Sequence, residues 1–334
     1  MNPFAEIMRS GRQLTYRESY AMQHGILSGS LGTEELVHIF EAMDGRYPTI
    51  VEMNGIIAAT KDTMIKVDLN SDALDMVGTG GDGMRTFNIS TVAAIICSAC
   101  GVPVAKHGNR SATSRCGSAD VLEALGVNIM LDAAQAASCF RETGMVFLYA
   151  PSFHPALKNA AQARKQYGKR TYFNILGPLV NPAGVSHLTL GVFDTQIGSL
   201  MGKAAIENGA RHVYIVHSPD GLDEISPFSH ADILHFSSSH AEGKSLEPGY
   251  RLQKGNMKDI QAVDAKESAG IIMALLRNEA TVIQKETALI NAAAGILTFG
   301  KAADFGEAMN MAAEVVESGR ALQKLNCLIE VSNE

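Results

Sequence analysis

From about Leu74 onward, short apolar runs alternate with alanine-rich stretches, and this alternation limits the fold more than any other feature of the chain. The runs read LDMV, VPVAKHG, VNIML, MVFLYA, LTLGVF and HVYIVHS. Such runs, separated by helical stretches, are typical of an open, largely parallel β-sheet with helices on its faces. We therefore expect an α/β domain over residues 73–334, with a mostly parallel central sheet that binds ligands at the carboxyl ends of its strands.

The first 70 residues carry the signals of helices and few of strands. Thr49 and Glu52 form a capping box, in which a hydroxyl and a carboxylate close the start of a helix. A second helix is expected after Thr33, where apolar residues recur on one helical face: Leu36, Ile39, Phe40 and Met43. We expect a small N-terminal helical domain over residues 1–72.

Composition and charge exclude several classes of function. The formal net charge is -7, which argues against broad nucleic-acid binding, because that binding needs basic surfaces. No secretory leader opens the chain, and no segment has the ~18 apolar residues of a membrane span, so we expect a cytoplasmic protein without membrane contact. The five cysteines are odd in number and lie in apolar surroundings, which favours reduced thiols.

The segment VGTGGDGMRTFNIST, Val77 to Thr91, contains a glycine-rich turn of the form G-x-G-x-x-G. A dinucleotide-binding turn opens its helix within the glycines and has an acidic residue about 20 positions later. Here the next helix is expected near Ser90, and the following strand ends in Lys106 and His107. A Walker loop is excluded because no Lys-Ser or Lys-Thr follows the glycines. The turn is better suited to a phosphate ligand.

A second polar loop, KHGNRSATSRCGSADVLEALG, runs from Lys106 to Gly126. It places a cation, an imidazole, an amide and several hydroxyls after a strand, and a helix is expected to start around Ser118. Such a loop can surround a polyphosphate with hydrogen-bond donors. A third motif, GLDE, follows the run HVYIVHS and brings the adjacent carboxylates Asp223 and Glu224. Mg²⁺ is typically held by one or two carboxylates plus substrate phosphates, although the same pair is also common in solvated turns.

Six motifs follow one another along the chain: GTGGD, N-x-S-T, KHGNR, GSADVLEALG, RTYFNILGPLVNP and GLDE. In these motifs and their order, the chain resembles the anthranilate phosphoribosyltransferases. The resemblance implies a helical domain joined to an α/β domain, the architecture shared with class II pyrimidine nucleoside phosphorylases. It implies a boundary near Asp72, with residues 165–184 crossing back to the helices, and a homodimer formed through the helical domain. The implied substrates are phosphoribosyl pyrophosphate (PRPP) and anthranilate, and the implied cofactor is Mg²⁺.

The same resemblance implies the residues of the site. Those expected at PRPP are Gly78, Gly81, Asp82, Thr86, Asn88, Ile89, Ser90, Thr91, Lys106, His107, Gly108, Asn109, Arg110, Ser111, Ala112, Thr113, Ser114 and Ser118. Those expected at anthranilate are Gly78, Asn109, His154 and Arg164, and those at the metal are Ser90, Asp223 and Glu224. Arg164 lies in a segment that reads as a basic amphipathic helix, and its planar fork is the natural partner of a carboxylate.

Several alternatives stay open at this point. His107 and His154 are equally compatible with a structural role. No general base is assigned, because an arylamine has an available lone pair. Cys116 stands where the family often has serine, which removes one hydroxyl from the phosphate loop. The run NAAAGI, from Asn291 to Ile296, also departs from the family pattern and is interpreted as packing.

Other functions on the same scaffold are weaker candidates. A pyrimidine nucleoside phosphorylase would carry the signature K-x-S-x-R-x-L-x-x-T-x-G-x-x-D, which this chain does not show. A non-catalytic nucleic-acid-binding relative would need a basic groove. The resemblance leaves open whether a separate glutamine amidotransferase component of anthranilate synthase docks on the helical domain.

Overall fold

The computed structural model describes residues 2–80, 83–110, 116–246 and 250–334, with the side chains of 240–246 left out. It confirms the α/β fold. One sheet has seven strands in the order β3-β2-β1-β4-β5-β6-β7; the first five are parallel and the last two antiparallel. The strands are β1 (Leu74–Gly78), β2 (Val104–Gly108), β3 (Met145–Tyr149), β4 (His187–Gly191), β5 (His212–His217), β6 (Asp232–Ser237) and β7 (His240–Leu246).

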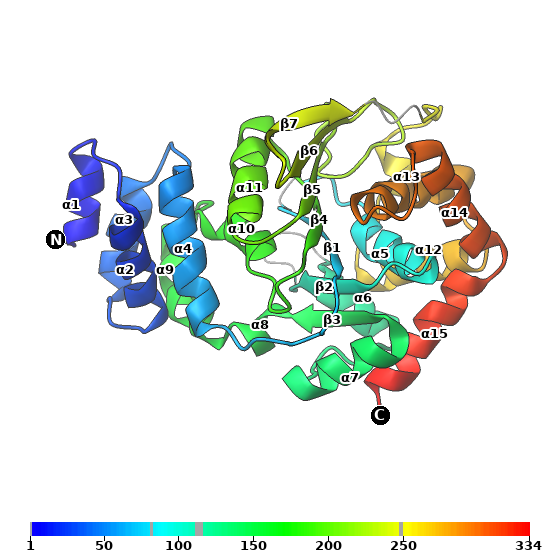
Figure 1. The fold of residues 1–334 in the computed structure, drawn as a ribbon, viewed down its shortest axis with the longest axis horizontal. Coiled ribbons are helices and arrows are strands. Elements are labelled where there is room, and N and C mark those ends of the chain that lie inside the picture. Colours follow the sequence, from blue (N-terminus) through cyan, green and yellow to red (C-terminus); the bar gives the residue numbers. More distant parts are fainter. Residues whose placement is uncertain (1, 81–82, 111–115, 247–249) are drawn as a thin grey trace.

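Helices cover both faces of this sheet (Figure 1). On one face, α5 (Ile89–Ala99) and α13 (Val282–Thr298) pack on each other and on the central strands. The helices α6 (Ser118–Ala124), α7 (Ala133–Thr143), α12 (Ala265–Leu276), α14 (Phe305–Glu317) and α15 (Arg320–Ser332) extend this side toward the C-terminus. On the other face, α11 (Thr195–Glu207) packs on β5, β6 and β7.

A group of helices stands beyond α11, at the left of Figure 1. It contains α1 (Pro3–Arg9), α2 (Tyr16–Leu27), α3 (Thr33–Ala42), α4 (Ile50–Thr63) and, from much later in the chain, α9 (Ala161–Tyr167). Leu36, Ile39 and Phe40 are buried, as the amphipathic pattern predicts. The predicted capping box is present at α4, where Thr49 Oγ1 accepts the Glu52 N–H at 3.2 Å and Glu52 Oε2 accepts the Thr49 N–H at 2.8 Å.

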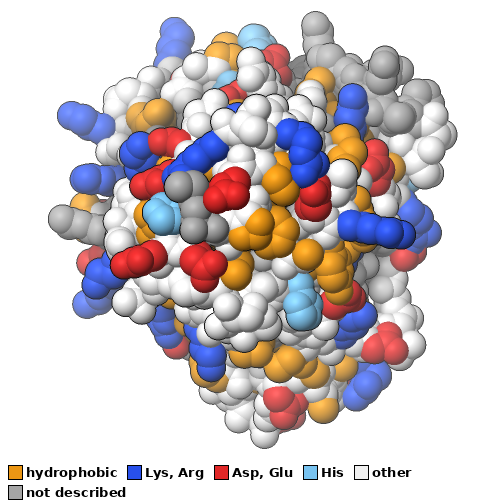
Figure 2. All heavy atoms as spheres, turned by 90° about the vertical axis from the view of Figure 1, so that its left-hand side faces the viewer, with side chains coloured by type: hydrophobic (Ala, Val, Ile, Leu, Met, Phe, Trp, Pro, Cys, Tyr) orange, Lys and Arg blue, Asp and Glu red, His pale blue; other side chains and the backbone are white. Residues whose placement is uncertain are grey.

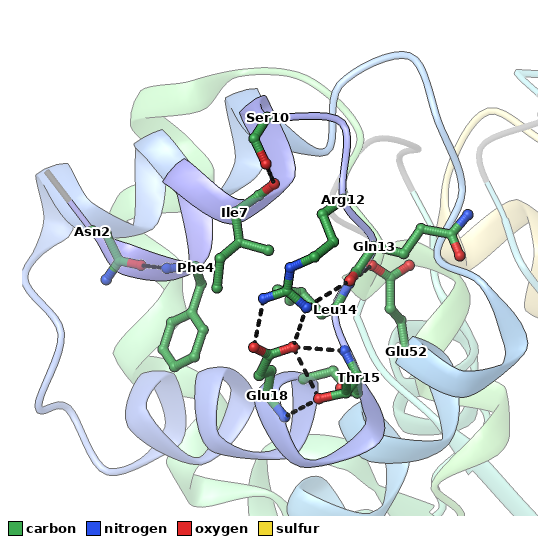
Figure 3. A network of polar contacts seen from close by, with 11 residues as sticks. Asn2, Phe4, Ile7, Ser10, Arg12, Gln13, Leu14, Thr15, Glu18 and Glu52 are labelled. Atoms are coloured by element: carbon green, nitrogen blue, oxygen red, sulfur yellow. Dashed lines mark hydrogen bonds and ion pairs between the residues drawn. The ribbon is translucent and has the colours of Figure 1, made fainter.

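Figure 3 shows how the starts of α2 and α4 are tied together. Thr15 caps α2, and the guanidinium of Arg12 binds both oxygens of Glu18 at 2.7 and 2.9 Å. The carboxylate of Glu52, at the first turn of α4, accepts the Leu14 N–H at 2.9 Å. Because Glu52 is buried and also paired with Arg46 at 2.7 Å, its charge is compensated.

Two expectations about local structure were wrong. The apolar run 127–131, read as a strand, is a loop: after Gly126 the Val127 N–H closes the end of α6 on the Leu122 carbonyl, and Asn128 N–H binds Ser332 Oγ at 3.1 Å. The side chains of Val127, Ile129 and Leu131 are buried, whereas Met130 is exposed, and the run has no strand pairing. The basic helix expected around Arg164 is split into a 3₁₀ turn, η1 (Pro155–Ala160), and the short α9.

The part of the chain that the structure describes has no helix whose length and hydropathy would suit a bilayer crossing.

Candidate functional site

Two glycines end neighbouring parallel strands and leave room for a carboxylate. Gly78 of β1 and Gly191 of β4 are paired in register. A Cβ atom on Gly78 would lie 2.4 Å from Asp223 Oδ2, and one on Gly191 would lie 1.6 Å from the Asp223 main-chain oxygen. The Gly80 N–H donates to Asp223 Oδ2 at 2.7 Å. The GTGGD and GLDE motifs therefore meet at the carboxyl edge of the sheet, as predicted.

Replacing Gly191 with alanine is expected to lower the free energy of unfolding by about 1–3 kcal/mol, because the new methyl group would displace the main chain of Asp223. Urea denaturation measures this change. Gly270→Ala is the matched control, since Gly270 lies within α12 with open space where its methyl group would stand, and it should gain a few tenths of a kcal/mol or more. Equal stability of Gly191→Ala and the wild type would show that Asp223 does not sit against the glycine.

The loop that carries Asp223 and Glu224 is held from outside by two polar side chains. Ser218 Oγ donates to the Glu224 carbonyl at 2.7 Å. Asn291 on α13 accepts the Ile225 N–H and donates to the Ile225 carbonyl, both at 2.9 Å. Sequence reasoning missed both residues and read the Asn291 segment only as packing. The one available signal was a lone asparagine in an alanine-rich helix.

Lys106 lies on β2 and is only 1 % exposed. Its ammonium group donates to the main-chain carbonyl of Met76 and to Ser90 Oγ, the latter at 3.3 Å. Burial lowers the pKa of Lys106, while the nearby carboxylates Asp75 and Glu224 act in the opposite direction. The structure thus places a cation between the end of β1 and the start of α5.

The start of α5 gathers amide, hydroxyl and thiol groups. Asn88 Oδ1 accepts the hydroxyl of Ser268 at 2.8 Å and the thiol of Cys116 at 2.9 Å. Thr91 Oγ1 is buried and has no hydrogen-bond partner among the residues that the structure describes. Burial raises the pKa of Cys116 to about 11, so the thiol stays protonated and keeps its bond to Asn88. The first N–H groups and the dipole of α5 favour a negative ligand here.

His107 and His154 form a buried pair. Their ring centres are 5.1 Å apart, and the Nε2 atom of each is buried without a hydrogen-bond partner in the described part of the chain. His107 Nδ1 lies 3.3 Å from the Gly177 carbonyl oxygen. Burial lowers the pKa of His107 to about 3, with a further lowering from His154, and burial lowers the pKa of His154 to about 4. Both rings are therefore neutral at pH 7, and each has one polar nitrogen to offer.

The depressed pKa of His154 predicts a loss of stability in acid. Above the unfolded pKa of 6.5, a histidine that stays neutral in the folded state makes its full contribution to the free energy of unfolding. As the pH drops toward about 4, the unfolded state takes up a proton that the folded state does not, so this contribution is lost. His154→Gln is expected to reduce the fall in unfolding free energy between pH 7 and 4 by about 2 kcal/mol. Urea denaturation across this pH range checks it, with His24→Gln, on the exposed side of α2, as the control. Parallel curves for wild type and His154→Gln would contradict the assignment.

Arg164 lies half-buried on α9, with its guanidinium 5.3 Å from the ring centre of Phe173. Within the described residues the guanidinium has no hydrogen bond or ion pair, so all five of its N–H donors remain to bind a ligand. Burial lowers its pKa, but a guanidinium keeps its charge at neutral pH. Because α9 is part of the helical group, Arg164 lies among those helices and not at the strand ends.

Other predicted residues of the phosphate loops have different surroundings. Asn109 is exposed after β2, whereas Arg110 is paired with Asp120 at 2.9 Å and with Glu123 at 2.5 Å. Gly108 is in close contact with α6, since a Cβ there would lie 2.2 Å from Ser118 Oγ.

Two more predicted residues lie at or just before the start of α5. Thr86 forms an isolated bridge with Gln261, and the Ile89 side chain is buried. Gly81, Asp82, Ser111, Ala112, Thr113 and Ser114 lie outside the described residues.

Two hollows of the molecule lie elsewhere. A cavity of about 330 Å³ lies between the α3–α4 loop and residues 170–175, and a smaller one of about 70 Å³ lies beside α11. Neither is lined by Gly78, Lys106 or Asp223. The convergent strand-end groups, rather than either of these hollows, form the candidate site.

The donor set at the site suits a hard cation that needs few protein ligands. Over residues 2–80, 83–110, 116–246 and 250–334, no three or more His, Cys, Asp or Glu side chains gather as a metal site. Asp223 and Glu224 are adjacent carboxylates beside a strand edge with hydroxyl and N–H groups. Mg²⁺ completes its coordination with water and substrate phosphates, so the pair fits Mg²⁺ better than a fully protein-coordinated metal.

Fold and site together define a glycosyl transferase. Residues 70–322 match the family described as "Glycosyl transferase family, a/b domain". Similar proteins include the anthranilate phosphoribosyltransferases of Methylocella silvestris, 38% identical over 100% of this chain and 95% of that protein, and of Salinibacter ruber, 37% identical over 100% and 99%. The chain belongs to the anthranilate phosphoribosyltransferase family.

Solved structures agree with this assignment. The enzyme of Thermus thermophilus has a TM-score of 0.91 at 32% identity, covering 99% of both chains. The enzyme of Saccharomyces cerevisiae, solved in complex with PRPP and Mg, has a TM-score of 0.89 at 26% identity, covering 99% of this chain and 97% of that one.

Proposed function

We propose that this protein transfers the 5-phosphoribosyl group of PRPP to the amino group of anthranilate, in tryptophan biosynthesis. The C1–O bond of PRPP breaks, the nitrogen of anthranilate bonds to C1, and pyrophosphate leaves; the nitrogen then loses one proton. The observation that carries this proposal is the meeting of Asp223, the glycine turn and the Lys106–Ser90 pair at one sheet edge. These groups suit a polyanionic leaving group, which is where charge develops in the reaction.

Ser90, Asp223 and Glu224 are the residues we assign to Mg²⁺. Bound Mg²⁺ would offset the charge of the pyrophosphate. Lys106 adds a fixed cation behind Ser90, and the buried Thr91 hydroxyl and the first N–H groups of α5 are available to phosphate oxygens. The flanking residues from Gly78 to Ser118 stay proposals for PRPP, and Arg110 is the least favoured because its charge is already paired.

Arg164 is the group we assign to the carboxylate of anthranilate, with Gly78, Asn109 and His154 around the ring. Its guanidinium is unpaired among the described residues and can bind both carboxylate oxygens. His154 is neutral, and its buried Nε2 suits a hydrogen bond to a neutral amine better than a role as a charged acid. No residue is assigned as general base.

The division into domains and the assembly are also proposals. We place the boundary near Asp72, with residues 165–184 returning to the helices; α9 packs on α3, and the Val67 N–H binds the Pro182 carbonyl at 3.1 Å. We place a homodimer contact on the helical end. Figure 2 shows hydrophobic side chains gathered on that face among acidic and basic ones, and Tyr16 and Val51 of this domain are exposed.

Two further assignments concern the protein's surroundings. The five free cysteines fit a reducing compartment, which supports the cytoplasm. A separate glutamine amidotransferase component of anthranilate synthase stays a possible partner, proposed from the family resemblance alone.

A test of the reaction is its stoichiometry. Anthranilate consumed and pyrophosphate released should agree one to one when the protein, PRPP and Mg²⁺ are mixed. Thymidine with inorganic phosphate should give no thymine. Release of pyrophosphate without consumption of anthranilate would show that another acceptor is used.

A further inference from the structure

A buried carboxylate lies beneath the site, in the central strand of the sheet. Asp75 of β1 is 0 % exposed. Its Oδ1 accepts the His107 N–H at 3.2 Å, and its Oδ2 accepts the Asn181 amide at 2.8 Å. Burying a carboxylate in a sheet is costly unless donors compensate it, so this placement points to a task beyond packing.

Asn181 connects this carboxylate to the segment that links the two groups of elements. Its Nδ2 also donates to the Ala105 carbonyl of β2 at 2.8 Å, and its Oδ1 accepts the Ala183 N–H at 2.9 Å. The preceding 3₁₀ turn, η2 (Gly177–Leu179), begins at Gly177, whose carbonyl lies 3.3 Å from His107 Nδ1. Asp75, Asn181 and His107 thus form a closed set of contacts between two strands and the linking segment.

Side chains alternate between the two faces of a sheet along each strand, and this alternation places Asp75 and His107 on one face. Leu74 of β1 pairs with Val104 of β2, so Asp75 and His107 point to the same face and Lys106 to the opposite one. Lys106 reaches Ser90 on the α5 side, where PRPP is proposed to bind. The face of Asp75 holds the His107–His154 pair, on the side proposed for anthranilate.

We propose that Asp75 is a positioning residue: through Asn181 and the main chain of His107 it holds the 177–181 segment against the sheet and so orients the His107–His154 pair for the acceptor. The effect of this role on catalysis rests on the proposed function. The carboxylate itself contacts no substrate. Burial raises the pKa of Asp75 to about 6, while Lys106 on the opposite face, the Asn181 amide and the His107 N–H act in the opposite direction.

The test removes either the carboxylate of Asp75 or its amide partner on Asn181. In Asp75→Asn, the amide oxygen can accept a hydrogen bond from only one of the two donors, the His107 N–H and the Asn181 amide. The new amide nitrogen then directs its own N–H groups at the other donor. We expect the KM for anthranilate to rise about five- to tenfold, the equivalent of one lost hydrogen bond, and the KM for PRPP to change less than about twofold. Asn181→Ala should give the same split and replaces Asp75→Asn if that variant does not fold.

An equal rise in both KM values, or no rise at all, would overturn the positioning role. Histidine NMR without substrates gives a second readout that does not need activity. The His107 and His154 signals should shift in both Asp75→Asn and Asn181→Ala, whereas unchanged signals would overturn the proposal. A wild-type protein without turnover would count against the proposed function alone, and the NMR comparison would still decide the role of Asp75.

Discussion

Exchanging Asp223 and Glu224 together for Asn and Gln is expected to lower Mg²⁺-dependent turnover by about a thousandfold or more. The two carboxylates carry the negative charge that the GLDE motif offers at the strand edge, and two amides attract a divalent cation far less. Losing stabilisation of the leaving group on this scale corresponds to about 4 kcal/mol of barrier. Initial rates at saturating PRPP and a series of Mg²⁺ concentrations measure it.

The matched control removes the same two charges elsewhere. Glu314 and Glu317 are exposed on α14 and pair with Arg320 and Lys285 on the surface, so their change to Gln should leave turnover within about twofold. If the Asp223/Glu224 variant retained more than about a tenth of wild-type activity while correctly folded, the metal assignment would have to be abandoned.

Arg164→Ala is expected to raise the KM for anthranilate about a hundredfold while the KM for PRPP changes less than about threefold. The guanidinium is half-buried and unpaired within the described part of the chain, so a bound carboxylate would be its main counter-charge, and bonds of this kind contribute about 1.5–3 kcal/mol each. Steady-state kinetics with each substrate varied in turn separates the two constants.

Two neighbouring variants sharpen this measurement. Arg164→Lys keeps the charge but loses the planar fork, so it should recover only part of the affinity. Lys165→Ala, an exposed neighbour on α9, should leave both constants unchanged. A similar rise in both KM values for Arg164→Ala would indicate a general disturbance of the fold and not an acceptor contact.

The parts of this structure that sequence reasoning predicted are those set by local chemistry. The capping box of Thr49 and Glu52 and the helix starting at Ser118 depend on residues a few positions apart, and both are present. The meeting of GTGGD and GLDE followed from the rule that parallel strands end at one edge. The apolar alternation likewise identified the parallel strands.

The missed features depend on partners distant in the chain. Val127–Leu131 has the composition of a strand, but the N–H groups of Val127 and Asn128 bind α6 and α15 instead of a neighbouring strand. Asn291 lies 66 residues from the Ile225 peptide that it holds, and Asp75 lies 106 residues from Asn181. No periodicity records such pairs. The antiparallel strands β6 (DILHFS) and β7 (HAEGKSL) were also absent from the predicted runs, because charged and polar residues interrupt their apolar ones.

The most direct measurement of the central claim is the decay of anthranilate fluorescence when purified protein is mixed with PRPP and Mg²⁺. The expected result is a decay that requires PRPP, stops when a chelator removes Mg²⁺, and resumes when Mg²⁺ is restored. A folded wild-type protein that leaves the fluorescence unchanged under these conditions would contradict the proposed transfer to anthranilate.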